Sequence, residues 1–69
     1  MMDNTGRKFV EAAKKKLEAD VADAEAKIEL YVMRSVGVGE HPSITEEIIK
    51  AAERGAHAQE VLDFIEERW

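Results

Sequence analysis

Two histidines, His41 and His57, are the side chains of this 69-residue sequence best suited to bind a metal or act as a base near neutral pH. They are 16 positions apart, which is roughly 24 Å along a helix at 1.5 Å per residue, so they cannot share a site within one chain. Carboxylate di-iron bundles use Glu-x-x-His on paired helices, whereas His57-x-x-Glu60 occurs once and in reverse order. We therefore expect no bound metal. A surface pair of His57 with a carboxylate is expected instead, either with Glu53 or Glu60 on its own helix or with Asp20 on the other helix.

The other residues that suggest chemistry have simpler explanations. Gly37-Val38-Gly39 lacks the preceding strand and the Lys-Ser/Thr ending of a phosphate-binding loop, and Glu40 would repel a phosphate there. Ser43 has no base placed beside it and is better suited to cap a helix. We expect no enzyme activity and no cofactor.

Composition restricts how the chain is stabilised. Apolar residues make up 45% of it, charged residues 36%, and there is no cysteine, which excludes disulfides and thiolate metal sites. A chain this short buries too little apolar surface to be comfortably stable alone, so helix packing and oligomerisation remain. No apolar run is long enough to span a membrane, and the N-terminus lacks the layout of a signal peptide. A cytoplasmic protein is the expectation.

Charge is distributed unevenly between the two halves. Residues 1–34 carry seven basic and seven acidic side chains, whereas residues 35–69 carry three basic and eight acidic ones, and the net charge is −5. An acidic surface repels phosphate backbones, so nucleic-acid binding is not expected.

Apolar residues recur every three or four positions between Val10 and Tyr31, which is the spacing of an amphipathic helix. The spacing predicts a helix over about residues 5–34. The run Lys14-Lys15-Lys16 falls between the spaced positions, so we expect it to face water.

A hinge is predicted over residues 35–42. Gly37 and Gly39 permit positive φ angles, and Pro42 forces His41 out of the α-helical region.

A second helix is predicted over residues 43–68, with Ser43 and Glu46 forming a capping box at its start. Its apolar residues repeat every seven positions without interruption. These positions are Ile44, Ile48, Ala51, Gly55, Ala58, Leu62, Ile65 and Trp69.

The short hinge makes the two helices antiparallel neighbours, so we predict an all-α, two-helix hairpin that forms one domain over residues 1–69. Bulky residues then cluster at the open end (Phe9, Ala13 and Leu17 beside Leu62, Ile65 and Trp69) and near the hinge (Ile28, Tyr31 and Val32 beside Ile44, Ile48 and Ile49). A waist of small residues lies between the clusters: Ala19, Val21, Ala22 and Ala24 on one helix, and Ala51, Ala52, Gly55, Ala56 and Ala58 on the other. Glycine inside a helix costs about 1 kcal/mol relative to alanine, and close packing of the backbones is the expected reason for Gly55. The alternatives are a bend in the helix, or room for a ligand or for a large side chain of another subunit.

The apolar stripes are broader than one partner helix can cover. We therefore predict that two hairpins associate as a homodimer that closes a four-helix bundle. The residues expected to take part in self-association are Ile49, Gly55, Val61, Leu62, Phe64, Ile65 and Trp69.

The hinge segment Val36-Gly37-Val38-Gly39-Glu40-His41-Pro42 resembles a segment of small helical-hairpin proteins of marine T4-like phages. The similarity centres on about twelve residues around the hinge, and the helices match only in general character. The family has no assigned activity, so the resemblance implies a phage source and an infected host cell, but no mechanism. It also implies that Gly37, Gly39, Glu40, His41 and Pro42 are the family's signature, either as hinge structure or as contacts to a partner.

The leading hypothesis is a small, non-enzymatic accessory protein that pairs with itself and presents helical surface to a host or phage protein. The alternative is a helical bundle that binds a metal or a small molecule at the waist, with His57 as a ligand.

Overall fold

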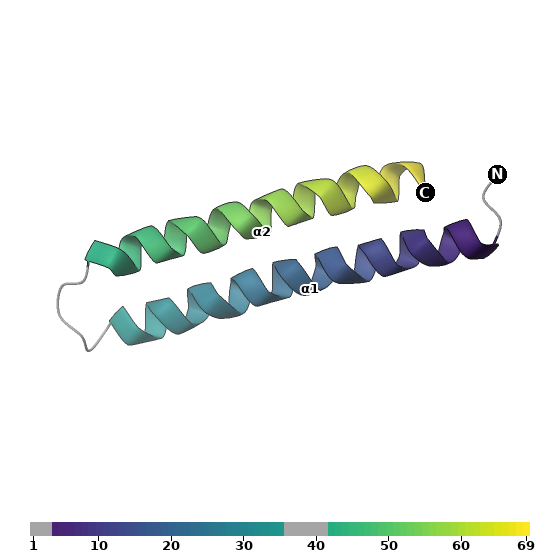
Figure 1. Cartoon of the computed structure of the whole chain (residues 1–69). Coiled ribbons are helices and arrows are strands. Elements are labelled where there is room, and N and C mark those ends of the chain that lie inside the picture. The colour runs from purple at the N-terminus through teal and green to yellow at the C-terminus, as the bar shows by residue number, and fades with distance from the viewer. Residues whose placement is uncertain (1–3, 36–41) are drawn as a thin grey trace.

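The structure is a computed structural model that describes residues 4–35 and 42–69 of the chain. Two helices account for all of these residues except Trp69: α1 (Asn4–Ser35) and α2 (Pro42–Arg68). They run side by side in opposite directions, so that the start of α1 and the end of α2 lie at the same end of the hairpin (Figure 1). The predicted all-α helical hairpin is confirmed, and each helix begins or ends within a residue of its predicted limits.

The start of α2 differs from the prediction by one residue. The helix begins at Pro42, so Ser43 lies inside the first turn and does not precede it as a cap. Proline suits the first helical position because its missing N–H would have no partner there and its φ angle is already helical.

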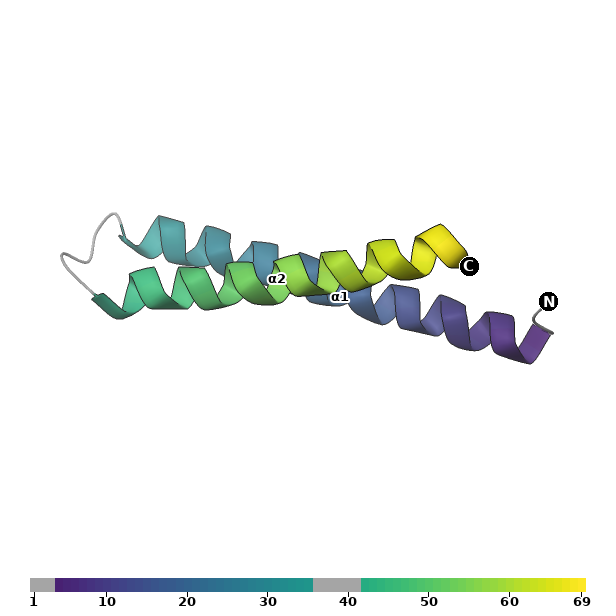
Figure 2. The same ribbon diagram turned by 90° about the horizontal axis from the view of Figure 1, so that it is seen from above.

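The core of the hairpin is one narrow seam. Ala24 of α1 and Ala51, Ala58 and Leu62 of α2 are buried, and these three α2 residues belong to the predicted seven-residue repeat. Seen from above, the helices cross at a shallow angle (Figure 2), as expected when the side-chain ridges of one helix pack into the grooves of another.

The waist of small residues is narrower than predicted. Ala52 and Ala56 of α2 and Ala19 and Ala22 of α1 are exposed. Each helix gives only a limited arc of its circumference to a single neighbour, and these alanines lie beyond it.

Lys14 also departs from the expectation that it faces water. Its side chain is only 18% exposed, and its Nζ lies 3.9 Å from a carboxylate oxygen of Glu11. Long basic side chains commonly cover apolar surface with their methylene groups while the charged end stays accessible.

The hairpin is long and thin, measuring 55 × 14 × 13 Å. Its radius of gyration is 16.2 Å, whereas a compact domain of this length would have about 11 Å. Neither α1 nor α2 contains an apolar stretch long enough to cross a membrane. A single layer of two helices leaves most of each helix facing outward.

Candidate interaction surface

The waist is closed by direct contact between the two helices. Ala24 is 3% exposed, and a Cβ atom added to Gly55 would lie 2.9 Å from the Ala24 Cβ, closer than real Cβ atoms approach. Glycine at position 55 therefore lets the backbones approach, which supports the packing role predicted for it. The Ala24 methyl group occupies the space that a ligand beside Gly55 would need.

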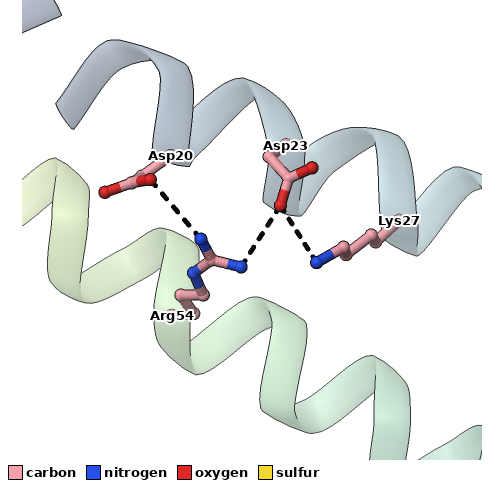
Figure 3. A network of polar contacts seen from close by, with 4 residues as sticks. All are labelled: Asp20, Asp23, Lys27 and Arg54. Atoms are coloured by element: carbon pink, nitrogen blue, oxygen red, sulfur yellow. Dashed lines mark hydrogen bonds and ion pairs between the residues drawn. The ribbon is translucent and has the colours of Figure 1, made fainter. Parts of the chain in front are cut away.

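One polar network crosses the seam near its middle (Figure 3). Arg54 of α2 donates from Nη1 to Asp23 Oδ2 at 3.2 Å and from Nη2 to Asp20 Oδ1 at 3.4 Å. Lys27 Nζ lies 3.0 Å from the same Asp23 oxygen. Asp20 and Asp23 are almost one helical turn apart, so one planar guanidinium reaches both carboxylates.

One of the three carboxylates considered as partners for His57 is used elsewhere. Asp20 accepts a hydrogen bond from Arg54, and the His57 side chain is exposed. The longer arginine side chain and its two-nitrogen fork suit a pair of carboxylates better than an imidazole does.

The polar residues do not gather into a metal site in the parts of α1 and α2 that the structure describes. No three His, Cys, Asp or Glu side chains among these residues are arranged to hold an ion. The metal-binding alternative therefore gains no support from the surroundings of His57.

The network makes one prediction about pH. The hydrogen bond from Lys27 has the largest effect and lowers the pKa of Asp23 below its ordinary value of 3.8. Desolvation, the second-largest effect, opposes this, and the charges of Lys27 and Arg54 lower the pKa further. A lowered carboxyl pKa adds stability above the unfolded-state value, and this stability is lost as the pH falls through the folded-state value. Thermal melts between pH 5 and pH 2.5 should therefore show a steeper loss of Tm for the native chain than for Asp23→Asn. The exposed Glu25→Gln variant is the control, and equal slopes for native chain and Asp23→Asn would contradict the prediction.

Large apolar side chains remain exposed on both helices. Phe9 and Met33 are 72% and 74% exposed, and five others are between 45% and 56% exposed. The five are Leu30, Val32, Ile49, Phe64 and Trp69.

The structure divides the residues predicted for self-association into two groups. Leu62 is buried and Gly55 contacts α1, so both already serve the contact inside the hairpin. The remaining five are exposed or half-buried and stay available to another molecule: Ile49, Val61, Phe64, Ile65 and Trp69.

An apolar groove of about 330 Å³ lies where the two helices meet at the open end. It is lined by Phe9, Val10 and Ala13 of α1 and by Ile65 and Trp69 of α2, which supports the predicted pairing of the bulky residues there. A separate shallow hollow one turn earlier in α2 is lined by Glu60, Val61 and Phe64. We use the name open-end patch for the apolar residues that line these two hollows at the open end: Phe9, Ala13, Val61, Phe64, Ile65 and Trp69.

The edge of the open-end patch is held in place by Arg68. Its guanidinium carbon lies 3.7 Å from the centre of the Phe64 ring, and its Nη1 donates to the Phe64 carbonyl at 3.2 Å. A guanidinium stacked on an aromatic ring fixes the ring while leaving its other face open. The Phe64 ring is therefore presented in a defined position.

Phe9 and Val61 of the open-end patch lie on the same side of the hairpin as the polar network. Residues seven positions apart share one side of a helix. Val61 lies seven positions after Arg54, and Phe9 lies fourteen before Asp23. This side therefore carries apolar groups at the open end and paired charges at its middle.

Sequence reasoning missed two parts of this surface. Phe9 was placed beside Trp69 but was left out of the self-association residues, because only the second helix has an uninterrupted repeat. The link from Arg54 to Asp23 was missed although the two positions are level in an antiparallel hairpin and carry opposite charges, which was the available signal.

Four residues of the hinge signature (Gly37, Gly39, Glu40 and His41) lie outside the residues that the structure describes. The resemblance to phage hairpin proteins therefore remains a prediction. No family model, curated protein or solved structure matches the chain.

Proposed function

We propose that this chain is a non-enzymatic helical hairpin that pairs with a second copy to close a four-helix bundle, and that the bundle presents helical surface to another protein. The observation that carries the proposal is the excess of exposed surface. The hairpin exposes 5452 Å², whereas a folded monomer of 7.8 kDa exposes about 4,400 Å² on the usual scaling with mass.

The size of this excess matches what pairing would remove. Burial of about 1,000 Å² on each chain would bring the exposed area to the value typical of a folded protein. It would give a total interface of about 2,000 Å², which is within the range of stable dimers. The small core of the hairpin also favours pairing. Only four of the described residues are buried, and all four are apolar.

A dimer whose folding and pairing are coupled makes stability depend on concentration. We expect the Tm, followed by circular dichroism at 222 nm, to rise as the chain concentration is raised from about 2 to 200 μM. A Tm that stays constant over this range would contradict self-association.

We also propose that the chain is a small accessory protein of phage type, which presents helical surface to a partner in the cytoplasm of an infected cell. It rests on the acidic outer faces of α2, where Glu53, Glu60 and Glu67 are exposed and lie away from the buried seam. Affinity capture from infected cells that recovers only copies of the chain itself would contradict this part of the proposal.

A further inference from the structure

We propose that Arg54 sets the register of the hairpin, that is, which residues of α1 and α2 lie level with each other, and thereby positions the groove at the open end. The charges along one edge of α1 match Arg54 at one level only. The inference concerns the contact between the two helices of one chain, so it goes beyond the proposed pairing and holds with or without it.

The apolar seam does not fix the register by itself. Its α2 residues repeat every seven positions without interruption, so α2 can move along α1 by seven residues, about 10 Å, and still set apolar residues against apolar residues. In the observed register Ala24 meets Gly55. In the shifted register, with α2 moved toward the start of α1, Leu17 would meet Gly55 and Ala24 would meet Ile48. A large side chain is again paired with a small residue, so volume does not exclude the shift.

The lengths of the helices also permit the shifted register. α1 has 32 residues and α2 has 27, and α1 projects beyond the end of α2 (Figure 1). Because Trp69 lies beside Val10, the shift would bring the end of α2 to the start of α1 and keep all of α2 beside α1. Ser35 and Pro42 would then be about 8 Å apart along the helix axis, which seven Cα-to-Cα steps of about 3.3 Å can bridge.

The charges beside the seam distinguish the two registers. Arg54 donates to Asp23 at 3.2 Å and to Asp20 at 3.4 Å (Figure 3). Seven positions earlier on the same side of α1 are Ala13 and Lys16. The shifted register would therefore replace two charge-assisted hydrogen bonds of Arg54 with repulsion from a lysine.

Glu47 disfavours the shifted register for the same reason. It lies seven positions before Arg54 on α2, and it now lines a small hollow together with Lys27. After the shift Glu47 would take the level that Arg54 holds now, where it would face Asp20 and Asp23. A single exposed ion pair contributes little, but here both contacts change from attraction to repulsion.

A shift of seven residues in the opposite direction is excluded more simply. It would carry the first two turns of α2 beyond the end of α1, which removes the packing of Ile44 and Ile48. It would also set Arg54 against Lys27, which lies seven positions after Asp20. Lysines therefore flank the two aspartates on both sides, and Arg54 is matched only between them.

The register decides whether the groove at the open end exists. Its α1 residues, Phe9, Val10 and Ala13, meet Ile65 and Trp69 in the observed register. In the shifted register, Ile65 would leave Ala13 for the first turn of α1. The groove lies more than two helical turns from Arg54, so Arg54 is a positioning residue for this surface and not part of it.

A charge swap on α2 tests the proposal. Glu47→Arg combined with Arg54→Glu leaves the net charge unchanged. In the observed register the introduced glutamate would face Asp20 and Asp23. In the shifted register it would face Lys16, and the introduced arginine would face the two aspartates. The swap should therefore move the hairpin into the shifted register.

Two pairs of introduced cysteines report the register, since the chain has no cysteine of its own. Ala13→Cys with Ile65→Cys joins positions that line one groove in the observed register, and Ala13→Cys with Ala58→Cys joins positions that become level after the shift. The fraction of each disulfide within one chain is measured by mass spectrometry after equilibration in glutathione buffer. The ratio of the first disulfide to the second should be above one with the native charges and below one with the charge swap.

The matched control is Glu11→Lys with Lys15→Glu, which exchanges two exposed charges of α1 that do not contact α2 and should keep the ratio above one. Adding Asp20→Lys, Asp23→Lys and Lys27→Glu to the α2 swap restores the charge match and should return the ratio above one. A ratio that stays at its native value in the α2 swap, or fails to return in the restored variant, would overturn the proposal. Only disulfides within a chain are counted, so the result does not depend on whether two hairpins pair.

Discussion

Replacing Gly55 with valine is expected to lower the Tm and broaden the melting transition. A single added Cβ at this position would already lie 2.9 Å from the Ala24 Cβ, and Ala24 is fixed on the backbone of α1, so the helices must move apart. Valine adds two further methyl groups at the same point. Overpacking of a tight contact costs about 1–3 kcal/mol, which is a large share of the stability of so small a chain.

The matched control for this variant is Ala56→Val. Position 56 is exposed on the same helix, so it takes the same side chain without a neighbour to displace, and its effect should be within about 0.5 kcal/mol. The double variant Ala24→Gly with Gly55→Ala moves one methyl group across the seam and should melt above Gly55→Val. A Gly55→Val variant that melts with or above Ala56→Val would show that the helices do not approach closely here.

Replacing Leu62 with alanine is expected to be the most damaging truncation of an aliphatic side chain. Leu62 is 6% exposed and is the largest residue in the buried seam. Removing a buried leucine side chain costs about 2–5 kcal/mol, because apolar contact is lost and a cavity remains. The expected result in urea denaturation is a large fall in the midpoint, or a chain that no longer unfolds cooperatively.

The Leu30→Ala variant is the control that shows whether the loss at position 62 depends on burial of the side chain. The same atoms are removed, but Leu30 is 45% exposed on α1, so the loss in free energy of unfolding should be less than half as large. Equal losses at positions 30 and 62 would mean that the seam does not run through Leu62.

The two helices and their pairing could be predicted because the signals are local. The spacing of apolar residues from Ile44 to Ile65 gives the second helix, and the glycines before Pro42 give the reversal. Once the chain reverses there, Phe9 must lie level with Trp69, and the open-end groove bears this out.

Finer features depend on how far each helix is rotated about its axis, which the pattern of one helix does not determine. Ala52 and Ala56 follow the buried Ala51 and the seam residue Gly55 in sequence. A step of one residue turns the side chain by about 100° around the helix axis, which leaves both alanines exposed. The orientation of α2 about its axis also brings Arg54 over Asp20, for which His57 was one possible partner. Packing of both helices together sets this angle.

The most direct test of the proposed pairing is the mass of the native chain by sedimentation equilibrium at micromolar concentration. We expect about twice the 7.8 kDa of one chain, because pairing would cover exposed apolar side chains and about 1,000 Å² of surface on each hairpin. A mass of 7.8 kDa together with a sharp, cooperative melt would contradict it, since the hairpin would then be stable with its apolar surface open to water.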